Sequence, residues 1–273
     1  MAEFTGKTVV VTGAGSGIGR STARLFGRLG AKVHVTDLDG DSAERVAGEI
    51  SSAGGQAVAH RLDVTDPTAV EKLAETVFET DGGVDVLHNN AGIAQSGTVE
   101  DTTLEDWRRV IEVNLMGTIH GVHAFVPRML RQGRPGHVVN TASAAGLVAS
   151  AELAAYSTSK FAVVGLTEAL NAELAPKGIH VTALCPGIIN TPIVRAATYR
   201  GEIAQHAQRV QDFYRDRGAS PDVVAEAAVE AVRKKKLIQP TPRSHVVPVW
   251  ILKRISPRAS QVFSRLAPRL ARR

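Results

Sequence analysis

A tyrosine and a lysine stand four positions apart in AAYSTSKFA, a run of small residues at positions 154–162. On a helix, positions i and i+4 share one face, so the phenol of Tyr156 and the ammonium of Lys160 would reach the same space. A free phenol has a pKa of about 10. A cation about 4 Å away, at an effective dielectric near 20, contributes on the order of 4 kcal/mol and lowers that pKa by up to about three units, less the opposing cost of burial. The pair predicts acid–base chemistry in which the tyrosine carries the proton.

A glycine-rich segment, TGAGSGIGR at 12–20, follows the first β-branched run of the chain. Its glycines Gly13, Gly17 and Gly19 have the spacing G-x-x-x-G-x-G. Glycines here permit a tight turn and let the backbone approach a pyrophosphate, and the following helix offers free N–H groups and the positive end of its dipole. The segment predicts a dinucleotide phosphate site. An ordinary βα turn is the alternative, and the position between a strand and a helix disfavours it.

An acidic residue, Asp37, directly follows the second predicted strand, 18 positions after Gly19. A carboxylate there can accept hydrogen bonds from the adenosine ribose hydroxyls and repels a 2′-phosphate. Ser16, inside the glycine segment, is not basic. Together these residues favour NAD over NADP. The alternative for Asp37 is a helix cap, a role that Asp39 or Asp41 could equally fill.

β-branched runs alternate with amphipathic segments along most of the chain. Strands are predicted at 8–11, 32–36, 57–61, 84–87, 137–140 and 180–184, and helices near 17–29, 41–53, 67–79, 104–130 and 154–175. This alternation predicts a single α/β domain over residues 1–240, a doubly wound Rossmann-type parallel sheet with helices on both faces. Residues 241–273 form an extension to it.

The composition narrows the class of protein. With 273 residues, 44% hydrophobic and 22% charged, the chain can bury a large core. Aromatic residues make up 4%, which disfavours stacking platforms for nucleic acid, and the single cysteine, Cys185, fits a reducing compartment. The start lacks the features of a signal peptide, and the apolar run 246–252 is too short to span a bilayer. We therefore expect a cytoplasmic protein.

With these pieces in place, the chain resembles the short-chain dehydrogenase/reductase family from about residue 7 to about 192. The resemblance is carried by the glycine spacing, LDV at 62–64, NNAG at 89–92, Asn114, Ser143, YSTSK at 156–160 and PGIINT at 186–191. It implies that the catalytic residues are Asn114, Ser143, Tyr156 and Lys160. It implies cofactor contacts from Gly13, Ser16, Gly17, Ile18, Gly19, Asp37, Asp63, Val64, Asn90, Ala91, Gly92, Tyr156, Lys160, Pro186, Gly187, Ile189 and Thr191.

The resemblance also implies individual roles. Tyr156 would exchange the proton, Lys160 would bind the nicotinamide ribose, and Ser143 would bind the substrate oxygen. Asn114 would hold a water that passes protons to Lys160. The adenine would lie against Asp63 and Val64, the adenosine ribose beside 90–92, and the carboxamide against Ile189 and Thr191. Structural alternatives stay open for several of them: a turn cap for Asp63, a corner for NNAG, close packing of small residues for Ser143, and a polar break in an apolar helix for Asn114.

The expected reaction is the NAD(H)-dependent interconversion of a secondary alcohol and a ketone. A 3-oxoacyl thioester reductase is one alternative, which Asp37 disfavours because reductive biosynthesis usually draws on NADPH; a catalytically idle dinucleotide-binding scaffold is another.

The region 193–218, the substrate lid in this family, contains Tyr199, Phe213 and Tyr214, which favours a lipophilic substrate. The resemblance implies a homodimer or homotetramer. No metal site is expected, because His120 and His123 lack a third ligand at a supporting spacing.

The extension is strongly basic. From residue 233 onward there are 12 Lys or Arg and no Asp or Glu, whereas residues 1–232 hold 20 basic and 27 acidic residues. After a short strand at 237–239, Ser256 and Pro257 predict a helix start, and Pro268 predicts a kink or an end. The predicted apolar stripe is Ile255, Ala259, Val262, Phe263, Leu266 and Leu270, flanked by Arg258, Arg265, Arg269 and Arg272. Three interpretations stay open: packing on its own or a partner subunit, a membrane interface with anionic lipid, or a non-specific nucleic-acid contact, which the absence of a binding motif disfavours.

Overall fold

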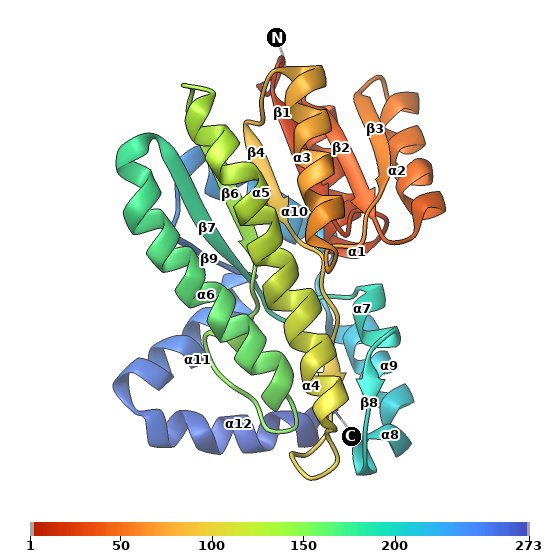
Figure 1. Ribbon diagram of the computed structural model, residues 1–273. Helices are drawn as coiled ribbons and strands as arrows, with labels where there is room; N and C mark the ends of the chain where they lie inside the picture. Colours follow the sequence, from red (N-terminus) through yellow and green to blue (C-terminus); the bar gives the residue numbers. More distant parts are fainter. Residues whose placement is uncertain (1–2, 272–273) are drawn as a thin grey trace.

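The computed structural model describes residues 3–271, and within the last helix it describes side chains only up to Arg265, without Phe263. The predicted stripe residues Phe263, Leu266 and Leu270, and the flanking Arg269 and Arg272, therefore lie outside the described side chains. Seven parallel strands form one sheet in the order β3-β2-β1-β4-β6-β7-β9 (Figure 1). They are β1 (Thr8–Thr12), β2 (Lys32–Asp37), β3 (Gln56–Arg61), β4 (Val86–Asn89), β6 (Gly136–Thr141), β7 (Ile179–Pro186) and β9 (Ile238–Thr241).

Helices cover both faces of this sheet, which confirms the predicted doubly wound fold (Figure 1). One face carries α1 (Gly17–Arg28), α2 (Gly40–Ser52) and α10 (Pro221–Lys234), and the other carries α3 (Pro67–Asp81), α5 (Gly117–Arg131) and α6 (Ala154–Leu174). A shorter helix, α4 (Leu104–Ile111), leads into α5 through a π-helical turn (Glu112–Met116). Each strand of the sheet begins and ends within two residues of its predicted position.

The first strand shows why this sequence builds two layers. Val9 and Val11 point into the core under α1 and α2, while Val10 points into the opposite core under α3 and α5, and all three are fully buried. Successive side chains of a strand face opposite ways, so a central parallel strand is apolar throughout. The chain lays β2 and β3 on one side of β1 and β4 onward on the other. The direction of winding reverses between β1 and β4, where the carboxyl ends of the strands leave a crevice.

The segment after β7 forms an organised layer over that crevice. It contains α7 (Pro192–Arg195), β8 (Thr198–Tyr199), α8 (Glu202–Gln205) and α9 (Ala207–Arg217), and β8 pairs with β5 (Gln95–Ser96). The guanidinium of Arg200 donates two hydrogen bonds, of 3.0 and 2.9 Å, to the carboxylate of Asp106 on α4. That pairing holds the pKa of Asp106 down at about 2. The segment that the sequence predicts as a lid is therefore held to the rest of the chain by the β5–β8 pairing and by the Arg200–Asp106 ion pair.

The extension forms two helices, α11 (Arg243–Ile255) and α12 (Pro257–Ala271). As predicted, α12 begins at Pro257, and Ser256 Oγ accepts a hydrogen bond from the backbone N–H of Ala259 at 3.3 Å. The helix runs past Pro268, so of the two predicted outcomes the end is wrong, and the kink stays a prediction. A proline removes one donor from a helix without always ending it, and Pro127 in α5 and Pro248 in α11 are accommodated in the same way.

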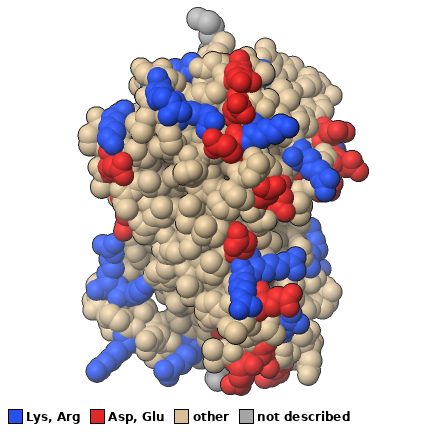
Figure 2. Space-filling model, in the orientation of Figure 1, with Lys and Arg blue, Asp and Glu red and all other residues tan. Residues whose placement is uncertain are grey.

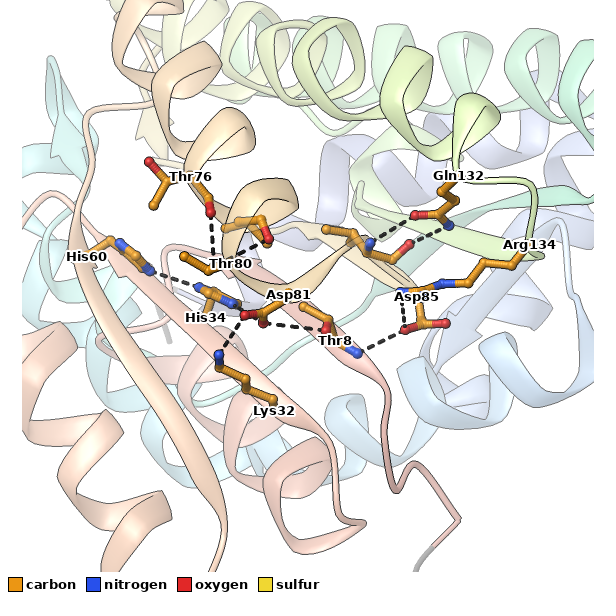
Figure 3. A network of polar contacts seen from close by, with 12 residues as sticks. Thr8, Lys32, His34, His60, Thr76, Thr80, Asp81, Asp85, Gln132 and Arg134 are labelled. Atoms are coloured by element: carbon orange, nitrogen blue, oxygen red, sulfur yellow. Dashed lines mark hydrogen bonds and ion pairs between the residues drawn. The ribbon is translucent and has the colours of Figure 1, made fainter.

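Charged residues tie together the amino ends of the strands (Figure 3). Asp81, at the end of α3, accepts a hydrogen bond of 2.6 Å from Lys32 Nζ and lies 2.9 Å from His34 Nε2. The other ring nitrogen of His34 lies 2.9 Å from His60 Nε2. A second centre is Asp85, which accepts from Lys7 Nζ at 3.0 Å, from the backbone N–H of Thr8 at 2.9 Å and from Arg134 at 3.3 Å.

Candidate active site

A cavity of about 700 Å³ opens along the carboxyl ends of β1, β4 and β6. It brings together nearly all of the residues that the sequence pointed to, from segments as far apart as Gly13 and Thr191. Of the predicted set, only Gly19 and Asn114 do not line it. The predicted residues in its wall are Gly13, Ser16, Gly17, Ile18, Asp37, Asp63, Val64, Asn90, Ala91, Gly92, Ser143, Tyr156, Lys160, Pro186, Gly187, Ile189 and Thr191.

The glycine loop leaves bare backbone at one end of the cavity. Gly13 and Gly17 have φ of 61° and 53°, a left-handed conformation that favours glycine. A Cβ on Gly13 would lie 2.7 Å from Ala91 Cα, and one on Gly19 would lie 2.2 Å from the carbonyl oxygen of Gly13. Gly19 thus supports the loop from behind, which explains its absence from the wall. The resulting cradle of backbone and helix N-terminus fits a diphosphate.

Asp37 lies at the cavity, and its carboxylate organises the loop. Its oxygens accept hydrogen bonds from the N–H of Gly15 at 2.8 Å and of Asp39 at 3.1 Å. The cap of α2 is supplied by Asp39, which accepts from Ser42 N. Asp37 is therefore not the helix cap that was the alternative for it, and its charge remains beside the cavity.

The corner after β4 is held by neutral hydrogen bonds. Asn90 Nδ2 donates to the carbonyl oxygens of Thr12 and Gly13 at 3.0 and 3.2 Å, and its Oδ1 accepts from Thr141 Oγ1 at 3.2 Å. This one side chain joins the ends of three strands. Asp63 lines the cavity but also caps a turn, because its Oδ1 accepts from the N–H and the hydroxyl of Thr65.

Tyr156 and Lys160 project from the first turns of α6 into the cavity wall. Lys160 Nζ lies 5.7 Å from the centroid of the Tyr156 ring and donates a hydrogen bond of 2.9 Å to the carbonyl oxygen of Thr141. Burial raises the pKa of Tyr156 to about 12, against the lowering effect of a hydrogen bond with Ser143. Burial also lowers the pKa of Lys160 to about 8. In the protein alone the phenol pKa is thus raised, contrary to the lowering predicted from the Tyr156–Lys160 spacing, because the cost of burying the phenolate outweighs the hydrogen bond with Ser143.

Ser143 follows β6 at the start of a short 3₁₀ turn, Ala144–Gly146. Its Oγ accepts a hydrogen bond of 3.1 Å from the N–H of Ala145. A Cβ on Gly146 would lie 2.6 Å from the carbonyl oxygen of Lys160, so this turn packs directly on α6. The close approach fixes the serine hydroxyl beside the Tyr156 phenol.

Asn114 lies in the π-helical turn and is completely buried. Its Oδ1 accepts from the N–H of Ile93 at 2.8 Å, and its Nδ2 donates to the carbonyl oxygen of Ile93 at 3.0 Å and to Ser159 Oγ at 3.1 Å. Through these contacts Asn114 clamps the loop after β4 to α6, next to Lys160. Such π turns are frequent at functional sites. Its role in proton relay through a water stays a prediction.

The far end of the cavity contains residues that sequence reasoning missed. Tyr199, Phe213 and Tyr214, the aromatic residues of the predicted lid, line it as expected. Four residues of the extension also line it: His245, Val246, Val249 and Ser264. No motif in the extension predicted this role, because these four residues are not part of the predicted apolar stripe.

Several other predicted features have definite places. Cys185 is buried in the core, and burial raises the pKa of its thiol to about 12, which keeps it protonated. His120 Nδ1 lies 2.9 Å from the carbonyl oxygen of Val64. Among the described residues no three His, Cys, Asp or Glu side chains gather as a metal site. In that same part of the chain, every helix is too short or too polar to cross a bilayer.

Comparison with known proteins agrees with this geometry. Residues 7–200 match the sequence profile of the family described as short chain dehydrogenase. The chain belongs to the short-chain dehydrogenase/reductase family. Its fold superposes on the crystal structure of a short-chain dehydrogenase/reductase from Burkholderia phymatum in complex with NAD, with a TM-score of 0.86 and 32% identity over 96% of this chain and 97% of that chain.

Curated relatives of this short-chain dehydrogenase/reductase include a probable oxidoreductase, EphD, of Mycobacterium tuberculosis, which is 40% identical over 96% of this chain. The chain spans 45% of the length of that relative. The 1-deoxy-11-beta-hydroxypentalenate dehydrogenase of Streptomyces exfoliatus is 42% identical over 70% of each chain. The cyclohexanol dehydrogenase of an Acinetobacter strain is 39% identical over 70% of this chain and 76% of its own.

Proposed function

We propose that the protein is an NAD(H)-dependent oxidoreductase that interconverts a secondary alcohol and a ketone on a lipophilic substrate. The observation that carries this proposal is the convergence of Ser143, Tyr156 and Lys160 on one cavity whose other end is the glycine loop and Asp37. When bound, the nicotinamide dinucleotide accepts or supplies the hydride. Glycine-loop backbone would hold its diphosphate, and Ile189 and Thr191 its carboxamide.

The proton chemistry belongs to Tyr156. With a pKa of about 12 the phenol is protonated at neutral pH, so it can donate its proton to a carbonyl oxygen as that oxygen gains charge. In the oxidative direction the phenol must first lose its proton, and the ammonium of Lys160 stabilises the phenolate. Lys160 remains mostly protonated below its own pKa of about 8. The Ser143 hydroxyl would hydrogen-bond the substrate oxygen where charge develops.

Cofactor preference follows from the charge of Asp37. A 2′-phosphate placed beside this carboxylate would meet a like charge in a partly buried site, which favours NAD. The Asp37→Asn variant keeps an oxygen acceptor for Gly15 and removes the charge. We expect this variant to reduce the ratio of NAD affinity to NADP affinity at least tenfold, with both affinities measured by quenching of protein fluorescence. The matched Asp39→Asn variant, altered only at the cap of α2, should leave the difference unchanged. Equal NAD and NADP affinity in the parent protein would contradict this preference.

The proposed substrate class rests on the far wall of the cavity, where Tyr199, Phe213 and Val249 lie. Two relatives support it, since one is named for oxidation of cyclohexanol and the other for oxidation of a hydroxypentalenate. A panel of cyclic and aliphatic secondary alcohols, followed by the absorbance of reduced nicotinamide, tests the class. Faster turnover of 3-hydroxyacyl thioesters would favour the reductase alternative. Tight NAD binding without turnover of any substrate would favour a scaffold.

A further inference from the structure

The two C-terminal helices have an outer face that the described part of the chain leaves uncovered. Four large apolar side chains lie on it: Ile251, Leu252, Ile255 and Val262 are 49%, 37%, 79% and 56% exposed. We call this surface the α11–α12 outer face. Burying apolar area is the main favourable term in association, so side chains of this size held in water indicate a surface that meets something else.

The inner face of the same helices fixes their orientation. Val246 and Val249 of α11 and Ser264 of α12 line the cavity, and Ser260 is buried. Lys253 Nζ donates a hydrogen bond of 2.7 Å to the carbonyl oxygen of Leu147. Among the described side chains of α12, Ser260 and Ser264 therefore face the body, whereas Val262 faces solvent.

The outer face is also basic. Arg243, Arg254, Arg258 and Arg265 are exposed on these helices, and no Asp or Glu occurs after Glu230. Figure 2 shows Lys and Arg, without Asp or Glu, over the lower left of the molecule, where α11 and the start of α12 lie. The guanidinium of Arg254 also lies 5.0 Å from the ring centroid of Trp250. Apolar side chains interleaved with long basic ones and a tryptophan are typical of helices that lie in a membrane interface.

We propose that the α11–α12 outer face lies on an anionic lipid surface. Charge complementarity selects this occupant: each basic residue near such a surface raises affinity about fivefold, and the apolar residues between them would enter the acyl boundary. A second copy of the chain, docked through the same face, would place basic residues against basic residues, which is unfavourable. A nucleic acid would place its charged phosphates against the apolar side chains of Ile255 and Val262, which is unfavourable.

Docking also bears on substrate entry, a consequence that rests on the proposed function. The outer face and the cavity wall are opposite sides of one layer of helices, so Val249 faces the cavity while Ile251 and Leu252 face outward. A lipophilic alcohol dissolved in the membrane would have a short path to the cavity. Docking itself is independent of any reaction.

Co-sedimentation of the full chain with lipid vesicles tests the docking. We expect retention by vesicles of phosphatidylglycerol with phosphatidylcholine, little retention by phosphatidylcholine alone, and loss of retention in high salt. The Ile255→Glu/Val262→Glu variant and the Arg254→Glu/Arg258→Glu variant should each weaken retention at least tenfold. All four positions are exposed, so both variants should fold, as checked by circular dichroism and NAD binding.

Matched controls alter equally exposed residues elsewhere. Val99→Glu/Leu104→Glu places the same charges on residues that are 73% and 71% exposed, and Arg108→Glu/Arg131→Glu reverses two exposed arginines on α4 and α5. Both control variants should be retained by the anionic vesicles to within twofold of the parent protein. The proposal is overturned by equal retention on neutral vesicles, by controls that lose as much, or by outer-face variants that change only the oligomer size or only binding to duplex DNA. Because no readout involves turnover, failure here would leave the proposed reaction standing.

Discussion

The two edges of the sheet are built from different chemistry. At the amino ends of the strands, carboxylates meet cations: Asp81 pairs with Lys32 and also contacts His34, and Asp85 pairs with Arg134 (Figure 3). Asp85 also pairs with Lys7. At the carboxyl ends lie a cavity, glycines and neutral hydrogen bonds. One edge satisfies its charges within the fold, whereas the other keeps backbone N–H groups and buried side chains for a ligand.

The contrast is sharpest in how each edge treats a lysine. Lys32 has the carboxylate of Asp81 at 2.6 Å, whereas the hydrogen bond that Lys160 donates goes to the carbonyl oxygen of Thr141. Burial pushes Lys160 and Tyr156 toward their neutral forms, to pKa values of about 8 and 12. Burying these two titratable groups destabilises the folded protein but shifts their pKa values, which is the pattern expected of a catalytic site.

The largest effect should come from removing one oxygen at the carboxyl edge. Without its hydroxyl, Tyr156→Phe has no proton to exchange, so kcat should fall by about 10² to 10⁴ while NAD affinity stays nearly unchanged. Stopped-flow turnover and fluorescence titration measure the two quantities. The control is Tyr199→Phe, which lines the same cavity and loses only a hydrogen bond to the carbonyl oxygen of Val194. Activity of Tyr156→Phe within a few-fold of the parent would remove Tyr156 from acid–base chemistry.

A second test adds one methyl group behind the glycine loop. In Gly19→Ala the new Cβ would lie 2.2 Å from the carbonyl oxygen of Gly13, so the loop must shift and NAD binding should weaken on the order of a hundredfold. Gly48→Ala is the matched change in α2, where a Cβ meets nothing within 4 Å. That substitution should raise the free energy of unfolding by about 0.5–1 kcal/mol and leave NAD binding unaltered. Similar NAD affinities in both variants would contradict the cradle.

At the amino edge, Asp81→Ala should affect stability and not the site. The variant leaves Lys32 and His34 without their carboxylate, at a cost of about 2 kcal/mol. For a chain of this size that lowers Tm by about 4–8 °C. NAD affinity should remain within twofold. The exposed Asp41→Ala is the control, and a loss of NAD affinity in Asp81→Ala would show that the two edges are coupled.

The sequence predicted the strands and the carboxyl edge of the sheet, but it predicted neither the ion network at the amino edge nor the inner face of α11. Glycine spacing, Asp37 and the Tyr156–Lys160 pair are local patterns whose residue types follow from chemistry, and the fold brings them together as expected. The ion network around Asp81 was not predictable in this way, because its members are single charged residues brought together only by tertiary packing. The inner face of α11 was missed for a similar reason: Val246 and Val249 carry no signature until the cavity is known.

The last test concerns the pH dependence of stability and a buried imidazole near the amino edge. Burial lowers the pKa of His137 to about 3, whereas an unfolded histidine titrates near 6.5. Between about pH 6.5 and pH 3 the unfolded chain binds a proton that the folded ring refuses, so the free energy of unfolding falls as the pH falls. In urea titrations at about pH 6 and pH 4, His137→Gln should flatten this dependence by up to about 1.4 kcal/mol per pH unit. The control is His123→Gln, at an exposed position, which should leave the pH dependence unchanged. If the free energy of unfolding depended equally on pH in both variants, the acid sensitivity would come from other groups.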